Sequence, residues 1–353
     1  MKALVKYERG VHNVELREVP VPEIGDDDVL MEVKAAGLCG SDLSFYEGKN
    51  QGALNTPVIL GHEFAGVVAE IGKNVTDWKK GDRVMSDNTG HVCGKCYACA
   101  TADFLSCPER LGMGYGMDGG FAKYVKVLGS TLKVYPKSLL PIPDDMTFEE
   151  AAVMDPACNG FRAAVQNAQV KPGDFVAVFG VGALGQFAIQ AARVAGAARI
   201  FAIARSGSKE RMKIASINGA THILYADQVD LVSEIKRLTD GKGLASAIDC
   251  AGANELIEQA IDMVRLGGII VKVGYDPDPP SFSFNKMIDR AITLKGHFAY
   301  DWRCWESVTN LSQAKKLSLD SVITHKMGLS EYEKALGMLK SKEALKIILY
   351  PED

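Results

Sequence analysis

The sequence lacks any apolar stretch long enough to cross a membrane. No segment of its 353 residues approaches the roughly 20 consecutive apolar residues that a membrane-spanning helix needs. The N-terminal segment MKALVKYERG also lacks the apolar core of a signal peptide. We therefore expect a soluble, cytoplasmic protein with no membrane partner. Thiols stay reduced in that compartment, so clustered cysteines indicate metal binding rather than disulfides.

The sequence also has little net charge and no long run of residues of one sign. Its formal net charge of −4 gives no reason to expect a groove for nucleic acid or a patch for anionic membranes. The apolar share of 47% and the charged share of 24% are ordinary for a globular protein. A chain of 353 residues with this composition can form two cores, so we expect two domains.

Strand-like and helix-like patterns divide the chain. Residues 1–35 alternate apolar and polar positions, which predicts short antiparallel strands, and glycine-rich β-type sequence continues to about residue 135. A helical segment, TFEEAAVMDPACNGFRAAVQNA, follows, and Thr147 and Glu150 are placed to form a capping box at its start.

Strands and helices alternate in the middle of the chain. The apolar runs FVAVFG and RIFAIA predict strands, and the segments ALGQFAIQAARVAGA and KERMKIASINGA predict the helices that follow them. HILYA, SAIDC and GGIIVKVG predict further strands. This alternation favours a doubly wound parallel sheet, so the fold class is α/β, with a mostly-β domain accompanying the parallel-sheet domain.

A loop with four closely spaced cysteines is the strongest motif in the sequence. Four thiolates at the spacing C-x2-C-x2-C-x7-C can form a closed tetrahedral shell around Zn²⁺. A closed shell leaves no position for a substrate, so we predict a structural zinc. The alternatives are four free thiols or a zinc-ribbon binding module. The four residues are Cys93, Cys96, Cys99 and Cys107.

Two further motifs, GLCGSD and GHEFAGVV, contain residue types that bind a catalytic zinc. Cys39 and His62 offer a thiolate and an imidazole, and Glu63 is close enough in sequence to reach the same metal. Asp155 is the candidate for the third protein ligand. Three protein ligands leave a position open for a substrate oxygen. On the residues alone, the alternative is that His62 is a hydrogen-bonded structural histidine.

The segment VFGVGALGQ carries a G-x-G-x-x-G motif between a predicted strand and a predicted helix. Gly180, Gly182 and Gly185 would let the turn tighten and the backbone approach a pyrophosphate at the helix N-terminus. We predict a dinucleotide site here that also includes Ala183 and Leu184. The alternative is a simple strand-to-helix turn.

The end of the second predicted strand bears on the choice of dinucleotide. NAD-binding folds place Asp or Glu there, about 20 residues beyond the glycine turn, to bond the ribose hydroxyls. Ala204 occupies this position and Arg205 follows it, with Ser206 and Lys209 nearby. A guanidinium can bind a 2′-phosphate in bidentate fashion, so we predict NADP rather than NAD. The alternative is that Glu210 or another acid serves the ribose.

Together these motifs resemble the zinc-containing medium-chain dehydrogenase/reductase family, and its sorbitol and polyol dehydrogenase branch in particular. GLCGSD, GHEFAG, the four-cysteine loop, DGGFAKYV and GVGALG occur in the family's order over essentially the whole chain. The resemblance implies a GroES-like catalytic domain over residues 1–157 and 297–353. It also implies a Rossmann dinucleotide-binding domain over residues 158–296, and a homodimer or homotetramer.

The resemblance implies roles for single residues. Ser41 matches the hydroxyl that receives the alcohol proton, and Asp42 matches the carboxylate that orients the imidazole ligand. Glu63 matches a residue that coordinates the metal or lies beside it. The residues that match the ligands of the catalytic zinc are Cys39, His62 and Asp155.

The sequence departs from the family pattern at two positions. Ser44 replaces a histidine that often completes the proton relay, and a serine hydroxyl is no base near neutral pH, so water would complete the path. Ala299 stands where sorbitol dehydrogenases carry an arginine that grips polyol hydroxyls, which weakens the case for sorbitol itself. The aromatic residues expected to line the substrate pocket are Phe45, Tyr46, Tyr300 and Trp302.

The predicted activity is hydride transfer between a secondary alcohol and NADP(H), or less favourably NAD(H), with two Zn²⁺ per subunit. A polyol or sugar alcohol is the expected substrate, and a simple secondary alcohol or a threonine-type hydroxy amino acid comes next. A zinc-free quinone or enoyl reductase would lack both zinc motifs. The alternative of a different class is a non-catalytic, zinc-stapled nucleotide-binding redox sensor, which would bind one zinc rather than two.

Overall fold

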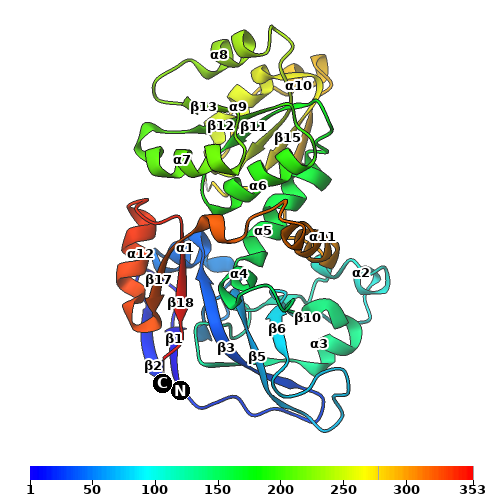
Figure 1. Ribbon diagram of the computed structural model, residues 1–353, viewed down its shortest axis with the longest axis vertical. Helices are drawn as coiled ribbons and strands as arrows, with labels where there is room; N and C mark the ends of the chain where they lie inside the picture. The colour runs from blue at the N-terminus through cyan, green and yellow to red at the C-terminus, as the bar shows by residue number, and fades with distance from the viewer. Residues whose placement is uncertain (277, 353) are drawn as a thin grey trace. The chain divides into compact units, whose positions relative to one another are not determined.

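The computed structural model describes residues 1–276 and 278–352 (Figure 1). The chain divides into two units by its internal contacts, Met1–Asp155 with Ile323–Asp353, and Pro156–Val322. The second unit is therefore inserted into the sequence of the first. The functional domains expected from the sequence remain a prediction, since contacts group residues by proximity and not by role. None of the helices in the described ranges combines the length and the apolar character that a membrane span requires.

Mostly antiparallel sheets form the first unit, and the pair β17–β18 is parallel. The larger sheet has the strand order β10-β6-β5-β3-β18-β17, with β9 also paired to β3, and smaller sheets have the orders β2-β1-β4 and β7-β8. Strand β3 pairs with β5, β9 and β18, so its apolar side chains are buried in the core of this unit. Figure 1 shows β18 beside β3, although the two strands come from opposite ends of the chain.

The strands of this unit are β1 Lys2–Lys6, β2 Val14–Glu18, β3 Val29–Leu38, β4 Val58–Ile59, β5 Glu63–Ile71, β6 Arg83–Ser86, β7 Thr89–His91, β8 Leu111–Gly112, β9 Tyr124–Val127, β10 Leu139–Pro141, β17 Ile323–Gly328 and β18 Lys346–Tyr350. Its helices are α1 Gly40–Tyr46, α2 Tyr97–Ala100, α3 Gly129–Val134, α4 Phe148–Ala152 and α12 Tyr332–Lys340, while α5 Met154–Phe161 spans the boundary between the units.

A parallel sheet with the order β13-β12-β11-β14-β15-β16 forms the second unit. Chain order runs outward in both directions from β11 and β14, which is the Rossmann arrangement and confirms the predicted doubly wound sheet. Its strands are β11 Phe175–Phe179, β12 Arg199–Ala204, β13 His222–Tyr225, β14 Leu244–Asp249, β15 Val264–Lys272 and β16 Thr293–Gly296, and its helices are α6 Ala183–Val194, α7 Lys209–Asn218, α8 Leu231–Leu238, α9 Asn254–Met263, α10 Phe284–Asp289 and α11 Trp302–Gln313.

The helical segment predicted to begin at Thr147 is divided in the structure. Thr147 Oγ1 accepts from the Glu150 N–H at 3.2 Å, and Glu150 Oε2 accepts from the Thr147 N–H at 2.8 Å, so the capping box is present. Helix α4 then ends at Ala152, α5 begins at Met154, and a π-helix covers Arg162–Asn167.

Candidate zinc and cofactor sites

The four cysteines of the predicted structural site meet within one loop, called the cysteine loop below. The sulfur atoms of Cys93, Cys96, Cys99 and Cys107 all lie within 4.8 Å of one another. The loop leaves β7 and returns at β8, and α2 lies inside it. Backbone N–H groups of Cys93 and Cys99 donate to the sulfurs of Cys107 and Cys96, at 3.4 and 3.5 Å.

Four sulfur atoms this close together suit four thiolates around a divalent cation better than four protonated thiols. Hydrogen bonds from the Lys95 and Cys96 N–H groups lower the pKa of the Cys93 thiol to about 7. Burial, together with the neighbouring sulfur groups, raises the pKa of Cys99 to about 12. A bound cation would reverse that rise and let all four groups act as thiolates.

A second group, Cys39, His62 and Glu63, is called the buried cluster. One ligand atom from each lies within 4.8 Å of the others. Cys39 follows β3 as the N-cap of α1, and Glu63 begins β5. The antiparallel register sets Gly37 opposite Glu63, and a Cβ at Gly37 would lie 2.4 Å from Glu63 Oε2. Glycine at position 37 therefore makes room for the carboxylate.

The helix that starts at this cluster orients its imidazole. Asp42 Oδ2 accepts from the Cys39 N–H at 2.9 Å, and Asp42 Oδ1 lies 3.6 Å from His62 Nδ1. Ser41 Oγ lies 3.3 Å from the other ring nitrogen, His62 Nε2. Three buried atoms, Asp42 Oδ1, His62 Nδ1 and Glu63 Oε1, have no hydrogen-bond partner among the described residues. Asp42 Oδ1 and His62 Nδ1 face each other, so the unpartnered oxygen that can serve a metal is Glu63 Oε1, beside the Cys39 thiol.

A buried lysine, which the sequence analysis did not identify, supplies a positive charge to the buried cluster. Lys346 Nζ donates to Glu63 Oε2 at 2.6 Å and to the Leu38 carbonyl at 3.0 Å. Burial alone would raise the pKa of Cys39, but His62 and Lys346 lower it to about 6. Burial raises the pKa of Glu63 to about 8, against the effect of Lys346, and a divalent cation would lower it again.

Asp155 is buried at the start of α5. Among the described residues, the ligand atoms that lie within 4.8 Å of one another in the buried cluster come from Cys39, His62 and Glu63, and the Asp155 carboxylate is not one of them. Asn88 Nδ2 donates to Asp155 Oδ2 at 2.9 Å. Direct ligation by Asp155 therefore stays a prediction. The role of Asn88 was missed, because nothing in the sequence links positions so far apart.

The glycine motif forms the turn between β11 and α6. Gly180 has φ +84°, and a Cβ there would lie 2.7 Å from the Ala251 backbone nitrogen. A Cβ at Gly185 would lie 2.0 Å from the Gly180 carbonyl oxygen, so this glycine lets the helix approach the strand. A Cβ at Gly182, the N-cap of α6, would have no atom within 4 Å. The N-terminus of the helix is therefore open to a phosphate. Ala183 and Leu184 begin the helix.

The end of β12 carries the residues predicted to select the dinucleotide. Ala204 ends the strand, and the Arg205 side chain is 74% exposed, with its guanidinium 3.6 Å from Glu255. Ser206 donates its N–H to Asp227 at 2.8 Å, and Lys209 begins α7. Asp227, which follows β13, therefore brings a carboxylate close to Ser206. The sequence analysis did not anticipate this carboxylate.

The structure places the two residues that depart from the family pattern in defined local surroundings. The Ser44 hydroxyl donates to the Gly40 carbonyl at 3.1 Å, within its own helix. Ala299 has φ +51°, in the left-handed region. Of the aromatic residues expected to line a pocket, Phe45 belongs to the core of the first unit, and the buried Tyr300 ring packs edge-on against Trp305 at 5.5 Å.

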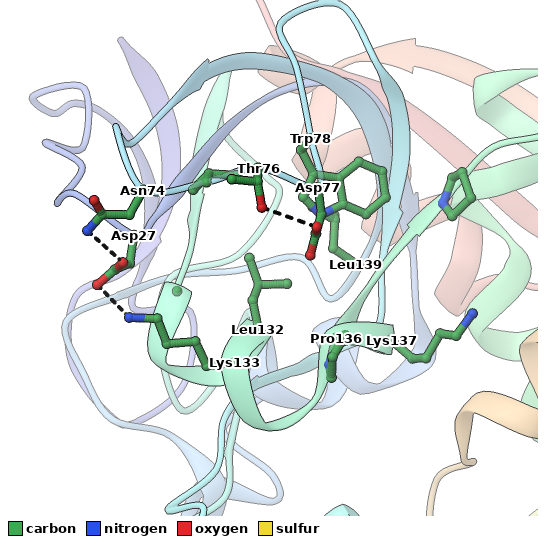
Figure 2. A pocket seen from close by; sticks show the side chains of 13 residues that line it. Asp27, Asn74, Thr76, Asp77, Trp78, Leu132, Lys133, Pro136, Lys137 and Leu139 are labelled. Carbon is green, nitrogen blue, oxygen red and sulfur yellow. Dashed lines mark hydrogen bonds and ion pairs between the residues drawn. The ribbon is translucent and has the colours of Figure 1, made fainter.

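A separate cavity of about 370 Å³ lies in the first unit (Figure 2). Trp78, Leu132 and Asp27 are among its lining residues, and Asp27 already accepts from Lys133 at 2.8 Å and Asn74 at 3.0 Å. None of the predicted site residues lines this cavity, so the candidate site is the buried cluster instead.

Two known protein families match the chain. Residues 25–137 match the alcohol dehydrogenase GroES-like domain, and residues 183–314 match the zinc-binding dehydrogenase family. These matches fall in the first and the second unit respectively, and they confirm the predicted combination of a GroES-like domain with a Rossmann sheet.

Individual relatives match over the whole length. The chain is 37% identical to the uncharacterised zinc-type alcohol dehydrogenase-like protein YdjL of Escherichia coli (strain K12), over 99% of this chain and 98% of that protein. It is 36% identical to a sorbitol dehydrogenase of Halalkalibacterium halodurans, over 100% of both. A structure assigned as a zinc-binding dehydrogenase from Sinorhizobium meliloti 1021, bound to NADP, superposes with a TM-score of 0.87 at 27% identity, over 99% of both chains.

Proposed function

Since this chain belongs to the zinc-containing medium-chain dehydrogenase/reductase family, we propose that it interconverts a secondary alcohol and a ketone with a nicotinamide cofactor. The observation that carries the proposal is the buried cluster, where Cys39, His62 and Glu63 bring their ligand atoms within 4.8 Å of one another. A thiolate, an imidazole and a carboxylate form a donor set that suits a catalytic Zn²⁺.

The residues around the cluster have distinct proposed roles. Bound zinc would supply Lewis acidity that lowers the pKa of the substrate hydroxyl. Asp42 holds the ring of His62, which fixes the nitrogen that faces the metal. Ser41, next to His62 Nε2, accepts the alcohol proton. Water carries the proton onward, because the Ser44 hydroxyl is bonded to the Gly40 carbonyl.

Two carboxylates compete to complete the ligand set. Glu63 already lies in the buried cluster and is held by Lys346. Asp155 is held by Asn88, and we propose that it supplies the third protein ligand when Glu63 is drawn toward the lysine. The four cysteines of the cysteine loop hold a second zinc, which stabilises the fold and takes no part in the chemistry.

The glycine turn at β11 binds the pyrophosphate of the cofactor, and we favour NADP over NAD. The cofactor would accept the hydride, while the protein orients it through the open N-terminus of α6. Ala204 offers no carboxylate to the ribose, and the largely exposed Arg205 is available to a 2′-phosphate. Asp227, bonded to Ser206, favours the second candidate, NAD, because its charge would repel a phosphate.

A polyol or sugar alcohol is the proposed substrate. The likeness to a sorbitol dehydrogenase supports it, while Ala299 in place of a hydroxyl-binding arginine points away from sorbitol itself. A simple secondary alcohol or a threonine-type substrate is the alternative within the same chemistry. The alternative of a different class is a zinc-stapled redox sensor without catalysis.

The protein is proposed to act in the cytoplasm as a homodimer or homotetramer. All four residues of β16, which ends the parallel sheet, are exposed, so this edge offers unpaired backbone groups to a second copy. Exposed apolar side chains of the same unit support this proposal: Phe284, Ile288, Leu294 and Phe298. Light scattering of the purified protein measures the assembly.

Metal analysis combined with a substrate panel tests the proposal. We expect two zinc ions per subunit and cofactor reduction with polyols, sugar alcohols, simple secondary alcohols or threonine, followed by absorbance. Cys158→Ala is a matched control, because this buried cysteine belongs to neither metal group, and it should keep both ions. One zinc per subunit and no alcohol oxidation would favour the redox sensor.

A further inference from the structure

Arg110 lies where the cysteine loop returns toward the buried cluster. Its backbone N–H donates to the Cys107 carbonyl at 3.0 Å, so it is tied directly to the last cysteine of the loop. Its guanidinium donates to Thr89 Oγ1 at 3.1 Å, Tyr115 Oη at 3.2 Å and Asn88 Oδ1 at 2.6 Å. A single side chain therefore contacts three others in three directions.

One of these contacts leads to Asp155. Asn88 accepts from Arg110 through Oδ1 and donates through Nδ2 to Asp155 Oδ2 at 2.9 Å. Asn88 and Asp155 are buried, with exposed fractions of 8% and 6%. Because a guanidinium only donates, it fixes the oxygen of the amide on its own side and leaves the NH₂ group for the carboxylate. Without Arg110, the amide could turn and present oxygen to oxygen.

A second contact leads to His62. The Tyr115 hydroxyl accepts from Arg110, and the Tyr115 ring meets the His62 ring edge-on, with centroids 6.2 Å apart and planes at 75°. Gly112 makes this position possible, since a Cβ there would lie 1.9 Å from Tyr115 Cζ. The tyrosine thus packs against the proposed zinc ligand while its hydroxyl is held from the cysteine loop.

The third contact closes the base of the loop. Strands β7 and β8 pair antiparallel, with Thr89 opposite Gly112, and the four cysteines lie between these strands in the sequence. Thr89 is also the residue to which Arg110 Nε donates. A cation held by the cysteines would keep the strand ends together and so keep Arg110 in place.

We propose that Arg110 is a positioning residue that transmits closure of the cysteine loop to His62 and Asp155, and thereby sets how tightly the buried cluster holds its metal. The inference rests on the proposed function, because it assumes a metal at that cluster. Lysine cannot replace Arg110, since a single ammonium group does not reproduce a planar fork that donates in three directions.

The test compares Arg110→Met with Arg83→Met in the zinc-loaded, full-length protein. Arg83 is a matched control, since it is also half-buried but donates to the backbone carbonyls of Pro143 and Met146. Tyr115→Phe removes the hydroxyl that accepts from Arg110, and Asn88→Leu removes the amide between Arg110 and Asp155, so the proposal remains testable if Arg110→Met does not fold.

Two readouts separate positioning from a general loss of stability. The first is the affinity of the buried cluster for its metal, measured by competition with a chelator, and a His62→Ala sample identifies which binding step belongs to it. The second is the visible spectrum of cobalt(II) bound there. We expect Arg110→Met to bind this metal roughly 10–100-fold more weakly than Arg83→Met, with an altered cobalt spectrum and a lower kcat. Arg110→Lys should recover little.

Opposite results would overturn the inference in recognisable ways. Folded Arg110→Met with the metal affinity and cobalt spectrum of Arg83→Met would overturn it, as would parent-like values in both Tyr115→Phe and Asn88→Leu. Cys107→Ser should weaken the buried cluster in the parent but add little to Arg110→Met, and fully additive effects would contradict transmission. A parent protein that binds no metal at the buried cluster would instead overturn the proposed function.

Discussion

Lys346 and Glu63 form a buried ion pair, with Lys346 Nζ 2.6 Å from Glu63 Oε2 and side-chain exposures of 3% and 0%. The lysine neutralises a carboxylate that water cannot reach, at the same place where a metal ligand is proposed. The pair therefore controls both the stability of the first unit and the charge that its metal site presents.

Lys346→Met should destabilise the protein strongly, because it leaves Glu63 buried without its cation. Removing one partner of a buried pair costs about 3–5 kcal/mol, which urea denaturation would register as a lower free energy of unfolding. The double variant Lys346→Met/Glu63→Leu should regain part of this loss. Lys326→Met, which removes a half-exposed lysine from another ion pair, serves as the control. A loss no larger than that of the control would contradict the assignment.

His62→Ala should remove one zinc ion and nearly all activity while leaving the fold intact, because the proposed structural zinc is bound elsewhere. Cys99→Ser should instead lower the thermal midpoint, since a structural zinc contributes folding energy. Metal analysis, circular dichroism and an alcohol-oxidation assay on both variants make the comparison. Substantial alcohol oxidation by His62→Ala would rule out the proposed mechanism.

Ser41→Ala should affect turnover and not metal content. One general acid–base group is typically worth about 10²–10⁴-fold in rate, and kcat at neutral pH should fall within that range. Ser44→Ala is the matched control, because the Ser44 hydroxyl is bonded to a backbone carbonyl of its own helix. If the two variants turned over equally fast, the alcohol proton would have to leave by another route.

Glu149 predicts a pH dependence of stability. Burial alone would raise its pKa, but hydrogen bonds from Lys326 and Tyr350 lower it to about 2, below the usual value of 4.5. Its stabilising contribution is therefore complete above pH 4.5 and disappears as the pH falls through about 2. Glu149→Gln should cost about 1–2 kcal/mol at neutral pH, and its gap to the parent should close across that acidic window. The exposed Glu109→Gln should show no such convergence, and a gap for Glu149→Gln that stays constant with pH would contradict the prediction.

Ala204→Asp combined with Arg205→Ile should move cofactor preference toward NAD. The change supplies a carboxylate for the ribose hydroxyls and removes the guanidinium proposed to bind the 2′-phosphate. The ratio of kcat/KM for NADP to that for NAD, measured in parent and variant, should fall. A parent that already prefers NAD would show that Asp227, next to Ser206, governs the choice.

Features encoded within a few residues were predictable from the sequence, and features that depend on strand register were not. The cysteine loop, the glycine turn and the Thr147 capping box each need only nearby residues, and the structure contains all three. Lys346 reaches Glu63 across 283 positions, and Asn88 reaches Asp155 across 67. Only the pairing of β18 with β3 brings the lysine to the site. One clue was present, because Lys346 opens the apolar strand KIILY, where a buried charge requires a partner.

The insertion of the second unit determines the order in which the first unit can be completed during synthesis. Pro156–Val322 lies between Glu63 and Lys346 in the chain, so the ribosome must make the whole inserted unit before the lysine emerges. Until then the nascent first unit lacks the strand that neutralises its buried carboxylate, and this region must stay hydrated or be shielded by a chaperone. The buried cluster is therefore expected to mature late, with zinc loading after translation of the inserted unit.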